Sequence, residues 1–373
     1  MKLFMITLLY TLTYVPVLAF LAMTPYLTRK TESFGISIPE NVYGHPEIVR
    51  IRKTYRNKVF ALGGLLAVFA VLFILFTSNN DATLFMPIGL VGTIVGSFLL
   101  YLEGHTKMKA LKAVEKWTLD KPQAVVVDTD FHSKKIAVNP AWFLLYAFVI
   151  LATLCLGVMF YDKMPLRVPM HIDINGVVDR YADKSYKLIF ITPMIQLFLT
   201  MLFIFVNYII TIAKQQIDAA NPEKSIEQNI RFRLIWSRFL VFMGFLTVAS
   251  MSFMQCMFVG LITDPWINAG IPIVVGGITS VMAIIISFKT GQGGSRLAAA
   301  VGKSGDVVNR DDDKCWKLGV FYYNPDDPAL FVEKRFGIGW TNNFAQPVSW
   351  ILLAAIAIVL PILITLVTNA LSS

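Results

Sequence analysis

Long apolar segments alternate with shorter polar segments along this chain of 373 residues. A helix that crosses a lipid bilayer needs about 20 mostly apolar residues. The segments that meet this requirement are 3–27, 59–77, 85–103, 141–161, 188–213, 234–261, 271–288 and 348–369. The pattern therefore predicts an all-α polytopic membrane protein with about eight transmembrane helices.

Lys and Arg residues are divided unequally between the loops. Of the 33 such residues, 26 lie in loops 28–58, 104–140, 214–233 and 289–347, whereas Lys2 and loop 162–187 contribute six. Cytoplasmic loops carry an excess of Lys and Arg, so we assign the first group to the cytoplasm. Eight crossings then place the N- and C-termini on the extracytoplasmic side. The first apolar segment is longer than that of a signal peptide, and we expect it to be retained.

The composition is consistent with lipid as the main solvent of the chain. Hydrophobic residues make up 56% of it and charged residues 15%, compared with about 45–50% and about 25% in soluble domains. A net charge of +9 also suits nucleic-acid binding, but these charges are spread between apolar segments. We therefore expect membrane lipids and no nucleic acid among the partners.

The outer loop 162–187 alternates apolar and polar residues, which predicts a short strand. Asn175 and Gly176 form a typical type I′ turn sequence, so we expect a small extracellular β-hairpin over the outer mouth of the bundle. Its polar residues either lock the loop or form a contact surface for a ligand or peptide. The candidate residues are Pro165, Pro169, His171, Asp173, Asn175, Gly176, Asp179, Arg180 and Lys184.

Aromatic and turn-forming residues are concentrated in the cytoplasmic stretch 311–344. We expect a solvated turn at residues 311–313 and short β segments around the later glycines. The aromatic residues either pack on one another and on the membrane interface or bind a protein partner. The candidate residues are Trp316, Tyr322, Tyr323, Asn324, Pro325, Asp327 and Trp340. A further short hairpin is predicted within 125–138, with its turn near His132 and Ser133.

Few polar residues lie within the apolar segments, and Gln196, Asn207 and Gln255 are the candidates for a function there. We expect them to form interhelical hydrogen bonds or to line a polar pocket. No acidic residue, lysine or histidine lies near a bilayer midplane, which disfavours an ion-coupled transporter. Motifs for zinc, nucleotide or a nucleophilic serine are absent from the sequence. We therefore expect no catalytic residue, no metal and no cofactor.

Two segments resemble known families. The outer loop is similar to the domain of unknown function 1648, through Pro165, Pro169, His171, Gly176, Asp179 and Lys184, although Met164 and Ile172 replace its usual Leu and Phe. The cytoplasmic stretch resembles the domain of unknown function 5808. The residues that fit the second family are Trp316, Gly319, Tyr322, Tyr323, Asn324, Pro325, Asp327, Pro328, Phe331, Val332, Gly339, Trp340 and Asn343.

The resemblance implies a domain organisation and a location. It divides the chain into an N-terminal membrane region (1–140), a membrane core similar to the first family (141–288), a cytoplasmic segment (289–347) and a last helix (348–373). One branch of the first family is a bacterial immunity protein against a peptide toxin, which recruits a transcriptional repressor when toxin is bound. The resemblance therefore implies a multi-pass protein of the bacterial plasma membrane.

Our first hypothesis for function is a non-enzymatic sensor or immunity-type protein. A peptide ligand would bind outside, and a cytoplasmic regulatory protein would bind inside. One alternative is a permease for a hydrophobic or peptidic solute, with a pathway lined by Gln196, Asn207 and Gln255. Another is a membrane enzyme acting on lipid or cell-wall precursors, which would depend on His171 with Asp173 or Asp179.

Overall fold

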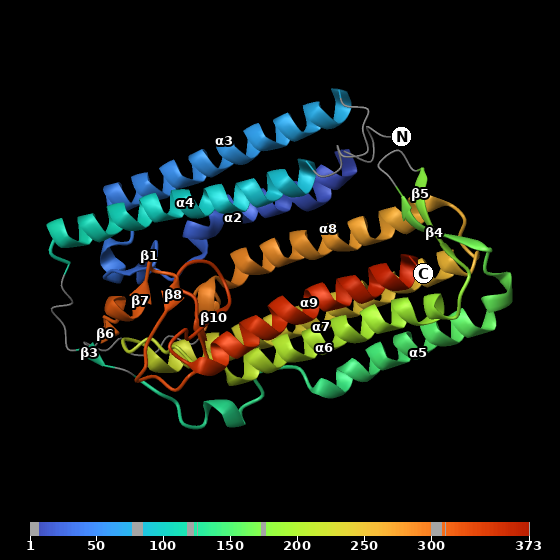
Figure 1. Ribbon diagram of the computed structural model, residues 1–373. Coiled ribbons are helices and arrows are strands. Elements are labelled where there is room, and N and C mark those ends of the chain that lie inside the picture. The colour runs from blue at the N-terminus through green and yellow to red at the C-terminus, as the bar shows by residue number, and fades with distance from the viewer. Residues whose placement is uncertain are drawn as a thin grey trace.

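The computed structural model describes residues 7–76, 85–117, 123–124, 126–172, 177–299, 308–309 and 311–372. These residues form an elongated bundle of long helices with small two-stranded sheets at its two ends (Figure 1). The long helices, preceded by a π-helical turn η1 (Tyr10–Tyr14), are α2 (Val15–Leu27), α3 (Pro46–Phe76), α4 (Phe85–Val114), α5 (Leu144–Met159), α6 (Lys187–Ile212), α7 (Pro222–Phe258), α8 (Pro265–Thr290) and α9 (Pro347–Ser372).

The strands are short and pair in twos. Four pairs are antiparallel, namely β1 (Glu32–Ser33) with β2 (Ile36–Ser37), β4 (Arg167–Ile172) with β5 (Val178–Asp183), β7 (Trp316–Lys317) with β8 (Phe321–Tyr322), and β9 (Phe331–Glu333) with β10 (Trp340–Asn342). One pair is parallel, β3 (Gln123–Ala124) with β6 (Val308–Asn309). Short 3-10 helices lie at Glu40–Val42, Phe131–Ser133, Pro140–Phe143, Tyr161–Lys163, Gln292–Gly294 and Asp313–Cys315.

The long helices pack in two groups. Helices α2, α3 and α4 contact one another, as do α5, α6 and α7, and α8 bridges the groups through α7 on one side and η1 and α2 on the other. Helix α9 packs against α6 (Figure 1). Seven helices in the described part of the chain are long and apolar enough to cross a membrane. The coarse prediction of a multi-pass helical membrane protein is therefore confirmed, and α9 occupies the position of the eighth predicted segment.

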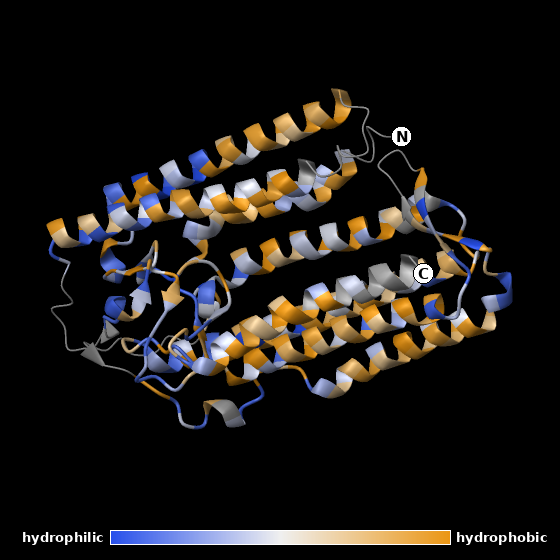
Figure 2. Cartoon of the chain, viewed as in Figure 1, coloured by the Kyte–Doolittle hydropathy of each residue, from blue (hydrophilic) through white to orange (hydrophobic). Residues whose placement is uncertain are grey.

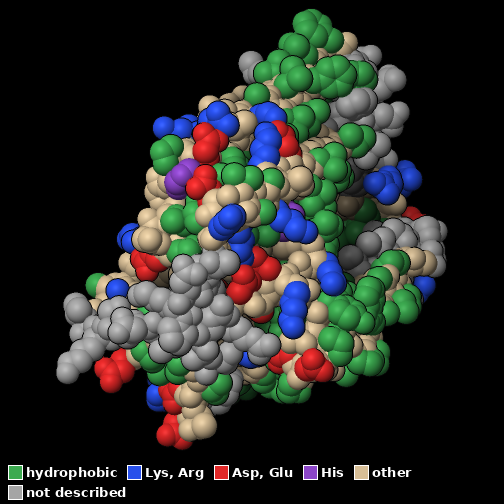
Figure 3. All heavy atoms as spheres, turned by 90° about the vertical axis from the view of Figure 1, so that its left-hand side faces the viewer, with side chains coloured by type: hydrophobic (Ala, Val, Ile, Leu, Met, Phe, Trp, Pro, Cys, Tyr) green, Lys and Arg blue, Asp and Glu red, His purple; other side chains and the backbone are tan. Residues whose placement is uncertain are grey.

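Hydrophilic residues gather at the end of the bundle that carries β1, β7 and β10, whereas apolar residues follow the helices (Figure 2). Following the predicted orientation, we call this the inner end. The opposite end, which we call the outer end, carries the β4–β5 hairpin, and α9 also finishes there (Figure 1). The described parts of the loops predicted to share one side therefore do meet at one end of the molecule. At the surface of the inner end, Lys and Arg side chains are mixed with Asp and Glu side chains (Figure 3).

Three helices extend further toward the inner end than the apolar segments indicate. Helix α4 continues to Val114 rather than ending near residue 103. Helix α3 begins at Pro46 rather than near residue 59, and α7 begins at Pro222 rather than near residue 234. The pattern of apolar residues detects only the part of a helix that faces lipid. The added turns are amphipathic, and their buried residues, such as Tyr55 and Phe232, pack at the inner end instead.

The hairpin predicted within 125–138 was wrong. Residues 126–130 and 134–139 form no strand, Phe131–Ser133 is a 3-10 helix, and neighbouring β3 pairs in parallel with β6. Instead, the backbone of Val138 forms hydrogen bonds with two helices, α7 and α6. Its N–H donates to Ser237 Oγ at 2.8 Å, and its carbonyl accepts from Asn207 Nδ2 at 3.5 Å. Contacts from distant parts of the chain thus override the local preference of valines for a strand.

Residues 311–346, which we call the inner module, dock onto the first helix group through a close backbone contact. The turn between β7 and β8 places Gly319 against Gly35, where a Cβ on Gly35 would lie 2.4 Å from the Gly319 carbonyl oxygen. Tyr101 of α4 donates a hydrogen bond to the Leu318 carbonyl at 2.8 Å. The inner module therefore sits directly on the chain between α2 and α3.

We predict that the substitution Gly35→Ala forces the backbones of residues 35 and 319 apart. Gly35 has a φ of +76°, and its alanine would suffer both backbone strain and the clash with Gly319. Gly339→Ala is the control, because Gly339 has a φ of +102° but no atom within 4 Å of its added Cβ. The melting temperature in mild detergent should fall several degrees further in Gly35→Ala than in Gly339→Ala. Equal losses would show that the close approach is unimportant.

Candidate functional site

The outer hairpin is fastened to the bundle along one face. Val168 of β4 and Ala182 of β5 are buried against Leu188 at the start of α6 and Phe258 at the end of α7. The opposite face is open, since Tyr181 is 49% exposed and lies under the Arg167 guanidinium, 5.5 Å from its ring centroid. The hairpin thus presents an exposed aromatic and cationic surface on a fixed base.

Lys184 closes the base of this hairpin. Its backbone N–H donates to the Leu166 carbonyl at 2.9 Å, and its ammonium group donates to the Asp162 carbonyl at 3.2 Å. The same ammonium lies 4.7 Å from the centroid of the Tyr161 ring, which stacks on Tyr186 at 4.1 Å. This lysine therefore holds the two ends of the outer loop together.

The other predicted residues of this loop are placed only in part. The backbones of Pro169 and His171 lie in β4, opposite Tyr181 and Arg180 of β5, with register shifts on both sides of His171. Asp173, Asn175 and Gly176, and the side chains of His171 and Asp179, lie outside the described residues. Arg180 is exposed, and Pro165 lies just before β4, near the Cβ position of Gly260. The hairpin itself was thus predicted correctly.

Gln196 and Gln255 lie in a polar core between α5, α6 and α7. The Gln196 amide is fully buried and donates to the Val248 carbonyl at 2.9 Å and to Ser252 Oγ at 3.1 Å. Gln255 is also fully buried, and the Cβ position of Gly157 lies 2.8 Å from its Nε2. Within the described chain, neither polar atom of the Gln255 amide has a hydrogen-bond partner. Gln196 therefore links helices as expected, whereas Gln255 is a buried amide with unused hydrogen-bonding capacity.

Asn207 lies nearer the inner end and joins three segments. Its Oδ1 accepts from Ser237 Oγ of α7 at 2.5 Å, and its Nδ2 reaches the Val138 carbonyl. Asn207 and Ser237 are both buried. The structure thus brings Asn207 to a helix junction that is separate from the core around Gln196.

Most of the predicted residues in the inner module build its interior. Trp316 and Tyr322 are buried with ring centroids 5.0 Å apart, and the Tyr322 hydroxyl donates to Asp327 at 2.8 Å. Asn324 donates to the same hydroxyl at 3.1 Å, and Trp340 packs on Phe232 of α7. Tyr323 and Pro325 remain exposed. These two are therefore the predicted residues that stay available to a partner.

A buried carboxylate that the sequence analysis missed joins the inner module to three helices. Glu333 of β9 forms an ion pair with Arg29, which follows α2, and accepts a hydrogen bond from Asn229 of α7 at 2.5 Å. It also lies 3.9 Å from the guanidinium of Arg233, whose side chain is completely buried. Arg233 in turn donates to the Ile210 carbonyl of α6 at 2.7 Å. Arg29, Glu333 and Arg233 are far apart in sequence, so no local signal could have grouped them.

A second ionic cluster corrects the predicted turn at 311–313. Arg335 is buried and forms ion pairs with Asp312 and Asp313, and Lys112 of α4 binds Asp313 at 2.7 Å. Asp312 and Asp313 are therefore the counter-charges of a buried arginine, although their side chains remain 41% and 25% exposed. Burial favours the neutral form of Asp313, but the neighbouring arginine and lysine outweigh this and lower its pKa.

Glu32 of β1 lies beside the same cluster. Burial raises the pKa of this carboxyl, even though Arg29 and Arg335 act in the opposite direction. Its Oε1 accepts from Gln216 Nε2 at 3.3 Å, and its Oε2 has no partner among the described residues. Burial therefore favours the protonated form of the Glu32 carboxyl.

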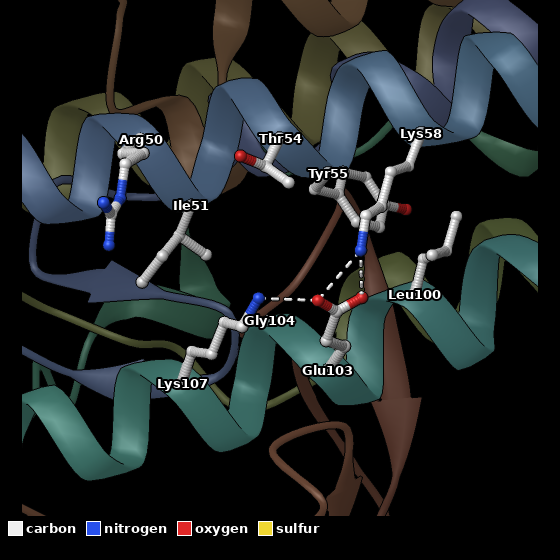
Figure 4. Close-up of a pocket in the computed structure, with 9 residues that line it drawn as sticks. All are labelled: Arg50, Ile51, Thr54, Tyr55, Lys58, Leu100, Glu103, Gly104 and Lys107. Atoms are coloured by element: carbon white, nitrogen blue, oxygen red, sulfur yellow. Dashed lines mark hydrogen bonds and ion pairs between the residues drawn. The ribbon is translucent and has the colours of Figure 1, made fainter.

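Two hollows at the inner end are candidates for ligand contact. The first, of 320 Å³, lies between α3 and α4, where Lys58 and Lys107 converge on Glu103 and Arg50 points into the same space (Figure 4). The second, of 440 Å³, lies between the α6–α7 connection and the inner module and includes Lys214, Tyr322 and Asp327. Lys214 closes it by binding Asp327 at 2.6 Å. Both hollows are lined by paired charges.

Family models match two segments of this chain. Residues 148–197 match the domain of unknown function DUF1648, and residues 325–350 match the family of unknown function DUF5808. The two resemblances drawn from the sequence are thus confirmed. The first match covers most of α5, the outer hairpin and the first part of α6, and the second covers Asp327, Glu333 and Arg335. No curated protein and no solved structure was found to match the chain.

We predict that Glu333→Gln destabilises the protein by about 3–5 kcal/mol, because it leaves the buried Arg233 without its counter-charge. Glu227→Gln is the matched control. Glu227 and Arg231 form an exposed pair one helical turn apart at 3.5 Å, and its loss should cost less than about 0.5 kcal/mol. Denaturation of the purified chain in mild detergent measures both values, and similar losses would contradict the assigned role of Glu333.

We predict a distinct pH dependence for Glu32→Gln. A pKa raised above the ordinary value of 4.5 means that the folded chain binds this proton more tightly than the unfolded chain. The stability that this proton provides is therefore lost as the pH rises through the folded pKa. Glutamine stays neutral, so the melting temperature of Glu32→Gln relative to the wild type should increase between pH 4.5 and 8. Glu40→Gln, on an exposed carboxyl, should show no such trend.

Proposed function

We propose that the protein is a non-enzymatic membrane sensor of the immunity type, located in a bacterial plasma membrane. In this proposal the outer hairpin binds a peptide ligand, and the inner module changes its contacts with a cytoplasmic regulatory protein. Both termini are extracytoplasmic. The observation that supports it best is that the same two helices, α6 and α7, are fastened to the outer hairpin at one end and to the inner module at the other.

Helix α6 makes the more direct of the two connections. It begins four residues after β5 ends, and Leu188 in its first turn is buried with the hairpin. Just beyond its inner end, the backbone N–H of Lys214 donates to the Phe331 carbonyl at 2.8 Å, and the Lys214 ammonium binds Asp327. A shift of the hairpin that moves α6 along its axis would therefore act on the inner module without an intermediate loop.

Helix α7 provides a second, parallel connection. Phe258 near its outer end is buried with the hairpin, and Asn229 and Arg233 near its inner end reach Glu333. Because packed interiors yield little, a displacement at one end of such a helix is carried to the other. Helices α6 and α7 thus connect the proposed ligand-binding surface directly to the inner module. This arrangement suits a signalling function better than a purely structural one.

The inner module also has a surface free for a partner. Phe321 of β8 is 41% exposed and Tyr323, directly after β8, is 48% exposed, whereas Tyr322 between them is buried. Asp326, beside them in the chain, is exposed as well. Exposed aromatic side chains next to a polar turn are typical of protein contact sites.

A photo-crosslinking residue at Tyr323 tests this proposal in cells. We expect it to capture a soluble protein, and we expect the yield to change at least twofold in Lys184→Ala, which loosens the base of the hairpin. Adding Lys214→Gln should suppress that response, because it removes the ion pair to Asp327. The control is the same crosslinker at Tyr208, which is 56% exposed on α6. The proposal would be refuted if the crosslinking yield did not change in Lys184→Ala, or if no soluble protein were crosslinked.

A second candidate function is a permease for a hydrophobic or peptidic solute. The observation that favours it is the buried amide of Gln255, whose polar atoms have no partner among the described residues. Accumulation of labelled peptides in proteoliposomes, lost in Gln255→Leu but not in Tyr323→Ala, would support it over the sensor.

A further inference from the structure

A groove of 570 Å³ opens between α5 and α7 near the inner end of the bundle. Its walls are mainly apolar, with Leu145 and Trp142 from the α5 side and Leu234 and Phe242 from α7. Trp142 is 57%, Phe242 53% and Leu145 47% exposed on the outside of the bundle. In a membrane, these side chains would face the acyl chains of lipids.

Two cations, Lys135 and Arg238, line the same groove. Neither makes a hydrogen bond or an ion pair with any described residue, and no Asp or Glu lines the groove. The neighbouring Lys134 differs, because it binds Asp128 at 2.5 Å. An apolar groove with two unpaired positive charges is complementary to an anionic phospholipid, because such a lipid carries a negative headgroup next to apolar acyl chains.

The groove lies at the level in the membrane where a lipid headgroup is expected. Trp142 lies in the 3-10 helix Pro140–Phe143 just before α5, where the chain enters the apolar segment, and tryptophan is enriched at the membrane–water interface. Arg238 lies one residue beyond the buried Ser237, on the exposed side of α7. A long arginine side chain in this position can extend toward the headgroups while its stem covers apolar surface.

Hydrogen bonds within the protein hold the walls of the groove in place. Val138 is bonded to Ser237 of α7 on one side and approached by Asn207 of α6 on the other. Tyr146 is fully buried, and its hydroxyl donates to the Val241 carbonyl of α7. The groove is therefore formed in advance, which lowers the cost of binding.

We propose that an anionic phospholipid of the surrounding bilayer binds in this groove, with its phosphate between Lys135 and Arg238 and an acyl chain along Leu145 and Phe242. The site would tie α5 to α7 at the inner membrane surface. It is separate from the hairpin and from the inner module, and it does not depend on the proposed sensor function.

Native mass spectrometry of the purified full chain tests the proposal, with phosphatidylglycerol and phosphatidylcholine of identical acyl chains as probes. We expect the wild type to retain phosphatidylglycerol preferentially. Lys135→Gln combined with Arg238→Gln should weaken its retention about 30-fold, because each cation near the membrane surface contributes roughly a factor of five. Lys53→Gln combined with Arg56→Gln, which removes the same charge from the inner part of α3, should change it less than about threefold.

Leu145→Trp, which fills the apolar part of the groove, should weaken the retention of both lipids. Equal retention of the two lipids by the wild type would overturn the proposal, and so would an equal loss in the α3 control. Displacement of phosphatidylglycerol by millimolar glycerol phosphate would indicate a site for soluble anions instead. A dimer mass that disappears in Leu145→Trp would assign the groove to a second copy of the chain.

Discussion

The inner half of the molecule is organised around one buried charge, that of Arg233, which needs partners because it is removed from water. A buried guanidinium is strongly unfavourable unless it is paired and hydrogen-bonded. Arg233 meets this demand with the Glu333 carboxylate, the Asn229 side chain and backbone carbonyls at the end of α6. Each partner comes from a different segment, so the segments must assemble together for the charge to be buried at all.

This requirement explains why the inner module is part of the bundle rather than a domain on a linker. Arg29 extends the network to the end of α2, and Arg335 brings in the aspartates and α4. Breaking one partner of such a network costs more than its net contribution to stability, because the remaining charges stay buried. The network therefore specifies a single arrangement of α2, α6, α7 and the inner module.

The outer end is held by different forces. Among its described residues, the hairpin is fixed by apolar burial of Val168 and Ala182 and by the contacts of Lys184. Apolar burial is non-directional, whereas hydrogen-bonded ion pairs require a fixed geometry. In the proposed function, a ligand would act on the apolar attachment at the outer end, and the ionic network at the inner end would respond as a unit.

Several features followed from the sequence alone, because each depends on local composition. The apolar segments indicated the membrane helices, the excess of Lys and Arg indicated which loops share an end, and period-two alternation before Asn175 and Gly176 indicated the outer hairpin. The β segments of the inner module near Phe331 and Trp340 were likewise marked by their glycines and aromatic residues.

Tertiary structure alone decided which charges meet. Glu333 and Arg29 are separated by 304 positions, and no periodicity relates them, so the buried network could not be read from the chain. For the same reason the sequence did not show that Asp312 and Asp313, which remain partly exposed, neutralise Arg335. The valines near residue 126 were expected to form a hairpin with 136–138, although Val138 binds α6 and α7. Local composition determines which segments enter the membrane, whereas burial of a charge depends on partners that only the folded chain brings within reach.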